Sequence, residues 1–454
     1  MSFRSNVKKI IPRQAFKQIE PYGHLAEAMI EQTVMGFPAK GLKVIGVTGT
    51  DGKTTTCTLI TQMLRSSGYK VAMMTTISVD YGDGKGEQAN PSRMTTLGSL
   101  GLIKQLKKIK AAGVDWLVLE TTSQALAQHR VWSIPYTVAV MTNLSHEHLD
   151  YHGTFERYRD AKRMLFKQTN RNHKGLQIGV ANADDANGHF FASDVKNPIL
   201  YGVDKGDLRA TDIKLTPQGS HYTASYKNQT YQIACHLPGS FNVYNSLAAV
   251  GVGQAIGLMP QQIEQGIASL AAVEGRMTRV DEGQDFTVIV DYAHTPESFE
   301  KIFKEVRPLS KGRLIVVFGS AGRRDESKRA EQGQIAGRDC DIVIVTEEDD
   351  RDMDGPAILQ QIAAGAINAG KTEGQDLFLV HQREAAVQKA VDLAKSGDIV
   401  LLLGKGHEKS ILSNGPKAAH FRHLQQSDDD PQRVTKRAYD EVKVAHQILK
   451  ARKH

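Results

Sequence analysis

A glycine-rich turn between an apolar strand and an amphipathic helix constrains this chain more than any other sequence feature. Residues 42–47 form an apolar run that is typical of a buried parallel strand, and residues 53–67 carry apolar side chains on one helical face. The turn between them reads G-V-T-G-T-D-G-K-T-T-T from Gly46 to Thr56. This order predicts a phosphate-binding loop, in which backbone N–H groups at a helix N-terminus cradle phosphates.

The residues after the turn predict nucleotide binding with magnesium. We expect Lys53 to reach the β- and γ-phosphates and the Thr54 hydroxyl to bind Mg²⁺. The spacing departs from the usual G-x-x-x-x-G-K-[ST] pattern, because Val47 stands five positions before Gly52. The alternative is a glycine-rich turn with a chance lysine, which the flanking strand and helix disfavour.

Alternating strand-like and helix-like segments predict an α/β protein. After the turn, strands are expected at residues 71–75, 116–120 and 138–142, and helices at 98–112 and 155–166. Short alternating stretches within residues 201–237 favour antiparallel hairpins, and two helices follow at 243–256 and 260–271. A second α/β series begins near residue 286. The 454 residues are enough for two or three domains.

We therefore predict three parts. Residues 1–40 form a short lead-in, and residues 41–282 form a central P-loop ATPase-like domain with a parallel sheet and a small antiparallel sheet. Residues 283–454 form a Rossmann-like α/β domain.

Composition excludes several classes of protein. No run of 18 apolar residues provides a membrane span, and the basic N-terminus lacks the apolar segment of a secretory signal. The net charge of +7 is modest, and no basic stripe with interleaved aromatic residues predicts a nucleic-acid partner. The cysteines, Cys57, Cys235 and Cys340, are far apart, which favours a reducing, cytoplasmic location. The oligomeric state cannot be predicted from these features.

Acidic and histidine residues follow two of the predicted strands. Glu120 ends one strand, where a carboxylate beside a phosphate loop commonly completes a Mg²⁺ shell, although an ordinary polar strand end is the simpler interpretation. The segment T-N-L-S-H-E-H-L-D-Y-H over residues 142–152 suits a nucleotide-bound Mg²⁺, with zinc bound by His146, His148 and His152 as the alternative. Lys162 lies on the next predicted helix, where a lysine is usually a solvated charge.

Taken together, these motifs resemble those of the Mur ligases, and most of all the MurE type, the UDP-N-acetylmuramyl-tripeptide synthetases. The resemblance covers residues 42–449. It rests on G-T-D-G-K-T-T at 49–55, E-T-T-S-Q-A-L at 120–126, N-L-S-H-E-H-L-D-Y-H-G at 143–153, Y-R-D-A-K at 158–162, P-G-S-F-N-V-Y-N at 238–245, D-Y-A-H-T-P at 291–296 and G-K-G-H-E at 404–408.

The resemblance implies an ADP-forming acid–amino-acid ligase that uses ATP and Mg²⁺. A terminal carboxylate of the acceptor attacks the γ-phosphate, and an amino acid then displaces phosphate from the acyl phosphate. Thr54 and Glu120 would hold one Mg²⁺, His148 would hold a second, and Lys162 matches a carbamylated lysine. The implied ATP contacts are Gly49, Thr50, Asp51, Gly52, Lys53, Thr54, Thr55, Asn245, Arg276 and Asp291. The implied muramyl-peptide contacts are Thr95, Thr96, Thr122, Gln128 and Arg130.

The C-terminal part resembles the amino-acid domain of the family. Arg324, Gly404 and Glu408 match positions that hold the incoming amino acid. The family's D-N-P-R motif aligns with residues 348–351, where Arg351 is retained and Asp349 replaces the asparagine. The six acids within residues 347–354 predict either a pocket for a second amine, as in lysine or diaminopimelate, or a solvated acidic loop. Arg351 slightly favours diaminopimelate, whose side chain also ends in a carboxylate.

Other departures leave the acceptor open. Forty residues before the phosphate loop cannot form the uridine-binding domain of MurE-type ligases, so we expect the uridine contacts to be missing, truncated or supplied elsewhere. The family's T-T-P loop reads T-T-L at residues 95–97. The alternatives are a ligase for another acid, of the folylpolyglutamate or cyanophycin type, and an inactive ATP-binding partner subunit.

Overall fold

The computed structural model describes residues 13–90, 95–145, 149–416 and 433–452. The chain divides into two compact units, and the main division falls between Ala271 and Ala272. Two short segments, residues 216–219 and 237–239, group with the second unit. Within the described ranges, no helix is both long and apolar enough to cross a membrane.

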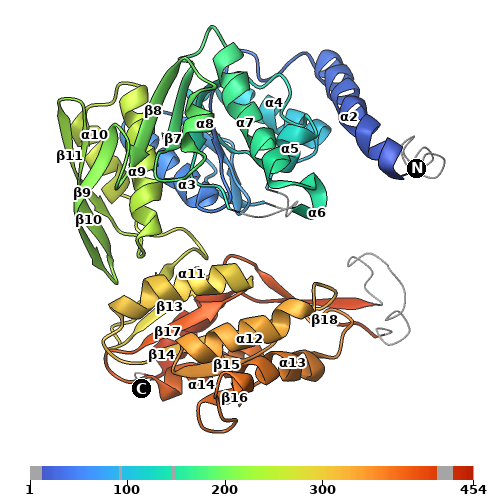
Figure 1. Cartoon of the computed structure of the whole chain (residues 1–454), viewed down its shortest axis with the longest axis vertical. Helices are drawn as coiled ribbons and strands as arrows, with labels where there is room; N and C mark the ends of the chain where they lie inside the picture. Colours follow the sequence, from blue (N-terminus) through green and yellow to red (C-terminus); the bar gives the residue numbers. More distant parts are fainter. Residues whose placement is uncertain (1–12, 91–94, 146–148, 417–432, 453–454) are drawn as a thin grey trace. The chain divides into compact units, whose positions relative to one another are not determined.

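The first unit is built on one mixed sheet (Figure 1). Among the described residues it has eleven strands in the order β11-β10-β9-β8-β7-β6-β1-β5-β2-β3-β4. The central strands β7, β6, β1, β5 and β2 are parallel to one another. The strand bounds are β1 Lys43–Thr48, β2 Val71–Met74, β3 Ser78–Asp80, β4 Gln88–Ala89, β5 Trp116–Glu120, β6 Tyr136–Met141, β7 Ile178–Asn182, β8 Asn197–Gly202, β9 Leu208–Thr216, β10 Gly219–Tyr226 and β11 Gln229–Cys235.

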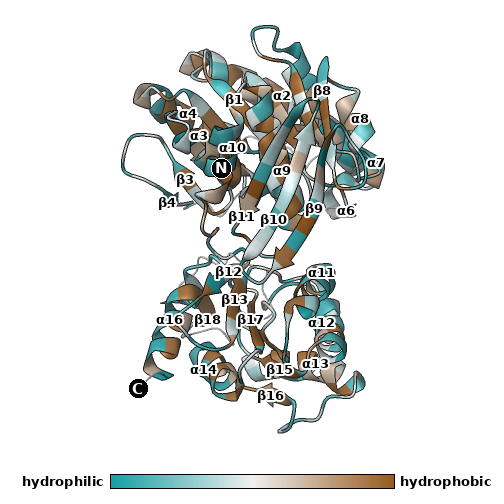
Figure 2. Ribbon diagram, turned by 90° about the vertical axis from the view of Figure 1, so that its left-hand side faces the viewer, coloured by the Kyte–Doolittle hydropathy of each residue, from teal (hydrophilic) through white to brown (hydrophobic). Residues whose placement is uncertain are grey.

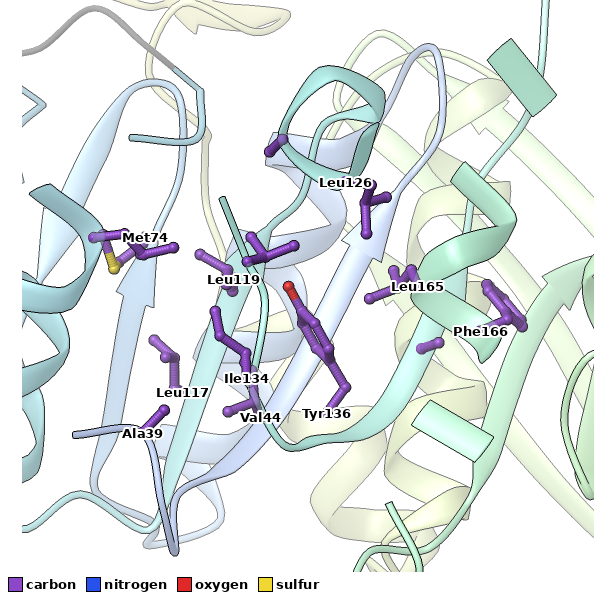
Figure 3. Close-up of a cluster of buried hydrophobic side chains, with 14 of the residues drawn as sticks. Ala39, Val44, Met74, Leu117, Leu119, Leu126, Ile134, Tyr136, Leu165 and Phe166 are labelled. Carbon is purple, nitrogen blue, oxygen red and sulfur yellow. The ribbon is translucent and has the colours of Figure 1, made fainter. Parts of the chain in front are cut away.

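Helices cover both faces of this sheet, which explains the continuous apolar runs of the central strands. Every residue of β5 and β6 is buried. One cluster joins side chains of β1, β5 and β6 to apolar residues of α4, α5 and α7, and Figure 3 shows Leu119, Tyr136 and Leu165 among them. The helix bounds are α2 Arg13–Met35, α3 Lys53–Ser66, α4 Ser99–Ala112, α5 Ser123–Ala127, α6 Leu149–His152, α7 Phe155–Arg171, α8 Gly188–Ala192, α9 Phe241–Ala255 and α10 Pro260–Ala268.

The second unit has a six-stranded sheet, ordered β12-β13-β17-β14-β15-β16 among the described residues. Alternate residues of β14 enter two different cores: Val316 packs with α11, α12 and α13, whereas Ile315 packs with α14 and α16. Figure 2 shows hydrophobic residues along β13 and β15. The bounds are β12 Thr278–Val280, β13 Thr287–Asp291, α11 Pro296–Val306, η1 Arg307–Leu309, β14 Leu314–Phe318, α12 Ser327–Asp339, β15 Ile342–Val345, α13 Gly355–Asn368, β16 Leu377–Leu379, α14 Arg383–Leu393, β17 Ile399–Leu403, β18 Ser410–Asn414, β19 Val434–Ala438 and α16 Glu441–Arg452.

The predicted fold class is confirmed, and the structure adds detail to it. The expected hairpin residues form β10 and β11, which pair antiparallel. They do not form a separate small sheet, because β9 and β8 connect them to the parallel strands of the same sheet. The short strands β7 and β8 and the β18–β19 hairpin were not predicted from the sequence.

Candidate active site

Two glycines allow the phosphate loop to fold tightly between β1 and α3. Gly49 and Gly52 have φ angles of 151° and 78°, in the region that side chains disfavour. A Cβ atom on Gly52 would lie 2.2 Å from Oδ1 of Asn245, and one on Gly49 would lie 1.9 Å from Oγ1 of Thr142. Only glycine fits at these two positions without displacing a neighbour.

The N-terminus of α3 is arranged to receive an anion. Its N-cap, Gly52, makes no side-chain hydrogen bond to the first helical turn, so the first N–H groups of the helix lack an internal acceptor. Nζ of Lys53 donates to the Thr50 carbonyl oxygen at 2.6 Å, which keeps the ammonium group against the loop. The predicted ATP contacts at residues 49–55 therefore form one continuous loop and helix start.

Glu120 lies at the end of β5 beside the phosphate loop. Its Oε2 accepts hydrogen bonds from the Thr54 hydroxyl at 2.9 Å and from the Thr76 N–H at 3.0 Å. Its Oε1 accepts from the Thr76 hydroxyl at 3.0 Å. The sequence analysis predicted that Glu120 and Thr54 act together, but it missed Thr76. This residue follows β2 and belongs to none of the motifs found in the sequence. The hydroxyl and carboxylate oxygens are ligand types that Mg²⁺ prefers.

The segment after β6 is hydrogen-bonded to the phosphate loop. The Thr50 N–H donates to the Asn143 carbonyl oxygen and the Asp51 N–H donates to Asn143 Oδ1, each at 2.9 Å. Asp185, which was not predicted as a site residue, accepts a hydrogen bond from the Leu144 N–H at 2.6 Å. The predicted ligand His148 lies outside the described residues, as does His146 of the zinc alternative. His152 is buried, and its Nε2 lies 3.0 Å from Oγ of Ser123.

Lys162 is buried, with only 2% of its surface exposed, so it is not a solvated charge. Its Nζ donates to the Gly49 carbonyl oxygen at 2.5 Å and lies 4.6 Å from the ring centroid of Tyr158. The Tyr158 hydroxyl is 3.0 Å from Oγ1 of Thr50. Lys162, which the family resemblance matches to a carbamylated lysine, is thus in direct contact with the phosphate loop.

The predicted acceptor residues form a connected group at the carboxyl end of β5. Oγ1 of Thr96 donates to the Glu120 carbonyl oxygen and accepts from the Thr122 N–H. Arg130 donates to the Thr96 carbonyl oxygen at 3.0 Å and to Oε1 of Gln128 at 2.7 Å. The Thr76 and Thr95 hydroxyl oxygens are 3.0 Å apart. All five predicted acceptor residues therefore connect to the carboxylate region through short polar contacts.

Arg276 and Asp291, the predicted nucleotide contacts of the second unit, lie near each other. Asp291 accepts from the N–H groups of Met277 and Ala293, each at 2.8 Å. Burial raises the pKa of Asp291, and the nearby Arg276 charge opposes that increase. The Arg276 guanidinium lies 5.0 Å from the ring centroid of Tyr292.

The acidic loop after β15 is buried rather than solvated. Asp349 accepts from Nζ of the fully buried Lys405 at 3.0 Å, and the same Nζ donates to Glu408 at 2.5 Å. Asp350 pairs with His381 at 2.6 Å. Asp349, which replaces the family's asparagine, thus has a cationic partner in Lys405, and Asp350 has a hydrogen-bonded histidine.

Glu348 and Arg351 are two further buried charged residues of this loop. Oε2 of Glu348 has no hydrogen-bond partner among the described residues, and burial raises the pKa of this carboxyl group to about 7. The oxygen lies 3.1 Å from where a Cβ on Gly404 would stand. Arg351 is 5% exposed and donates to the Gly322 carbonyl oxygen at 2.7 Å. Arg324, by contrast, is exposed.

Comparison with known proteins identifies the family. The sequence matches the Mur ligase middle domain over residues 47–253 and the Mur ligase glutamate ligase domain over residues 275–406. It is 41% identical over 404 residues to a UDP-N-acetylmuramyl-tripeptide synthetase of Roseiflexus sp., covering 86% of this chain and 79% of that protein. The chain belongs to the Mur ligase family. The predicted family and the predicted class of enzyme, an amide-forming ligase, are therefore confirmed.

Further similarities point to the same group within the family. The chain is 39% identical over 394 residues to a UDP-N-acetylmuramoyl-L-alanyl-D-glutamate–2,6-diaminopimelate ligase of Geobacillus thermodenitrificans, covering 86% of this chain and 79% of that protein. A solved diaminopimelate ligase of the same description superposes with a TM-score of 0.64 at 28% identity, covering 91% of this chain and 80% of that one. The prediction of a Mur ligase of peptidoglycan-precursor synthesis agrees with these names.

Proposed function

We propose that this Mur ligase adds a diamino acid, diaminopimelate in preference to lysine, to UDP-N-acetylmuramoyl-L-alanyl-D-glutamate. The observation that supports the choice of amino acid is the presence of two buried residues of opposite charge, Glu348 and Arg351, in one loop. A carboxylate suits an ammonium group, and an arginine suits a carboxylate through paired hydrogen bonds. Diaminopimelate offers both groups at the end of its side chain, whereas lysine offers only the amine.

The phosphate loop and its lysine serve the first step. The acceptor carboxylate attacks the γ-phosphorus of ATP, and the bond to the β-phosphate oxygen breaks to give an acyl phosphate and ADP. The N–H groups at the start of α3 bind phosphate oxygens, and Lys53 exchanges its bond to the Thr50 carbonyl oxygen for one to phosphate. These fixed donors stabilise charge that spreads over the transferred group.

Magnesium suits the oxygen-rich group next to this loop. Thr54 and Glu120 would hold one ion and His148 a second, and bound Mg²⁺ supplies neutralisation of phosphate charge. Lys162, in its carbamylated form, would present an anion in place of the ammonium group that now donates to Gly49. Acceptor recognition falls to Thr95, Thr96, Thr122, Gln128 and Arg130.

The second unit serves the second step. The amine of the incoming amino acid attacks the acyl carbon, and phosphate leaves with the bonding electrons while the amine loses a proton. Arg324 would bind the α-carboxylate, and Gly404, Asp349 and Glu408 would complete the pocket, with Lys405 holding the two acids in place. Asn245, Arg276 and Asp291 would contact the nucleotide.

Release of ADP and phosphate in the presence of defined substrates tests this proposal. Purified protein would be given ATP, Mg²⁺ and UDP-N-acetylmuramoyl-L-alanyl-D-glutamate, together with diaminopimelate, lysine, ornithine or glutamate, and products would be identified by mass spectrometry. We expect amino-acid-dependent turnover that is fastest with diaminopimelate. Turnover only with a folate or another acid acceptor, or no amino-acid-dependent turnover with any acceptor, would contradict it.

A further inference from the structure

A group of metal-ligating side chains lies at the carboxyl ends of β15 and β16. These strands pair in parallel, with Val345 opposite Leu379, and Glu347 and His381 stand two residues beyond that pair. The Glu347 N–H donates to the His381 carbonyl oxygen at 3.0 Å, which fixes the two chain segments side by side. Asp350, at the position of the proline in the family's D-N-P-R motif, completes the group. One ligand atom from each of the three side chains lies within 4.8 Å of the other two.

Two carboxylate oxygens of this group are available to a cation. Asp350 is 3% exposed, and its Oδ1 has no hydrogen-bond partner among the described residues. Its Oδ2 lies 2.6 Å from Nε2 of His381. Among the same residues, the hydrogen bonds to the Glu347 side chain come from Arg437 at 2.6 Å and the Arg383 N–H at 3.2 Å, and both end on Oε1. A buried carboxylate oxygen without a donor has lost its hydration, and a bound cation would replace that loss.

Gly355, the first residue of α13, leaves the ligand atoms uncovered. A Cβ atom at this position would lie 2.2 Å from Oδ2 of Asp350 and 2.2 Å from Nε2 of His381. Gly355 is not among the glycines with a positive φ angle, so its backbone conformation is open to other residues. It is therefore the space beside the carboxylate and the imidazole that excludes a side chain here.

We propose that Glu347, Asp350 and His381 form a binding site for a divalent transition-metal ion, with Zn²⁺ as the best match. Zn²⁺ binds imidazole nitrogen together with carboxylate oxygen, whereas Mg²⁺ prefers ligand sets of oxygen alone. The His381 side chain is 47% exposed, so an ion can enter from solvent and keep water as a further ligand. The site does not depend on the proposed function, because none of its ligands is assigned to ATP, the acceptor or the amino acid.

The charge around the group suits a divalent ion. Arg437 would repel a cation, but its guanidinium is shared between Glu347 and Glu384. The other nearby guanidinium, that of Arg383, is paired with buried Glu441. The two carboxylates of the site together with Glu384 therefore outnumber the one shared guanidinium by two charges, which a divalent ion balances.

Zn²⁺ binding to the full chain tests this proposal. Protein freed of metal with a chelator would be dialysed against Zn²⁺ at constant pH, with excess Mg²⁺ to compete at the site of Thr54 and Glu120. His381→Ala removes the nitrogen ligand, and Asp350→Asn removes a carboxylate charge. Gly355→Ala keeps all three ligands but places a methyl group against two of them. The matched control is His189→Ala, which removes an exposed histidine of α8.

We expect wild type and His189→Ala to bind one more equivalent of Zn²⁺ than His381→Ala and Gly355→Ala. Asp350→Asn should bind this equivalent more weakly by about tenfold or more, since even the loss of an outer partner of a metal ligand costs that much. Co²⁺ in place of Zn²⁺ should give the wild-type protein a visible absorption band that His381→Ala lacks. Circular dichroism would confirm that each variant is folded.

Unchanged Zn²⁺ stoichiometry and affinity in His381→Ala would overturn the proposal, as would a wild-type chain that binds no Zn²⁺. Wild-type binding in Gly355→Ala would contradict the position of the ion beside α13. Because His381 is exposed, its substitution leaves no cavity in the core. The His381→Ala comparison therefore decides the question even if Asp350→Asn or Gly355→Ala fails to fold.

Discussion

Glu348 should make the folded protein less stable as the pH rises, and replacing it with glutamine should remove that effect. Glu348 is only 8% exposed, and its Oε2 has no hydrogen-bond partner among the described residues. Loss of hydration raises the pKa of this carboxyl group from 4.5 to about 7, although Lys405 and Lys328 oppose the increase. The folded state therefore holds a proton that the unfolded chain releases at lower pH.

The size of the effect follows from this difference in pKa. Below pH 4.5 the carboxyl group is protonated in both states, and its ionisation does not alter the free energy of unfolding. As the pH rises from 4.5 to about 7, only the unfolded chain loses the proton, so unfolding becomes more favourable. Each pH unit corresponds to about 1.4 kcal/mol, and the total loss is therefore roughly 3 kcal/mol above pH 7.

Urea unfolding of Glu348→Gln and wild type between pH 4.5 and pH 8 checks this prediction. Far-UV circular dichroism would follow the whole chain, and hydrogen exchange at β15 would report on the second unit. We expect the stability difference to move in favour of the variant by up to about 3 kcal/mol across this range. The exposed Glu331, changed to glutamine, is the matched control and should show no such trend. A difference that stays constant with pH would refute the reasoning.

The other predictions concern turnover. Lys53→Ala should lower ATP turnover by about 10²-fold or more without loss of circular dichroism, because a fixed charge on the phosphates is lost; a folded variant with normal turnover would exclude the assigned role. Lys162→Ala should be nearly inactive, and formate or acetate should restore some activity by supplying the missing anion; a fully active variant would exclude carbamylation as a requirement. Arg351→Ala should raise KM for diaminopimelate by about 10²-fold, from a lost charged hydrogen-bond pair of roughly 3 kcal/mol, and should change KM for lysine much less. Equal effects on both amino acids would show that this loop does not select the substrate.

The parts of the fold that depend on contiguous residues could be predicted from the sequence. A strand that is buried on both faces needs an uninterrupted apolar run, and the strand predicted at residues 116–120 agrees with the bounds of β5. Strand β9 was missed because its side chains do not alternate regularly between buried and exposed positions. The β18–β19 hairpin was missed because its paired residues stand far apart in the sequence, as Ser410 and Ala438 do.

In the candidate site, too, some features could be predicted from local sequence and others depended on the tertiary structure. The phosphate loop, Glu120 and the lysine of α7 belong to local motifs, since the chemistry of phosphate binding requires particular residues at short, regular spacings. The environment of each charge depends on partners that are distant in the sequence. Asp349 and Lys405 are 56 positions apart, and Thr76 and Glu120 are 44 apart. A local pattern therefore could not decide whether the acidic loop is solvated or buried. Burial of its carboxylates became possible only when other strands brought cations against them, because an unpaired charge in the interior loses its hydration.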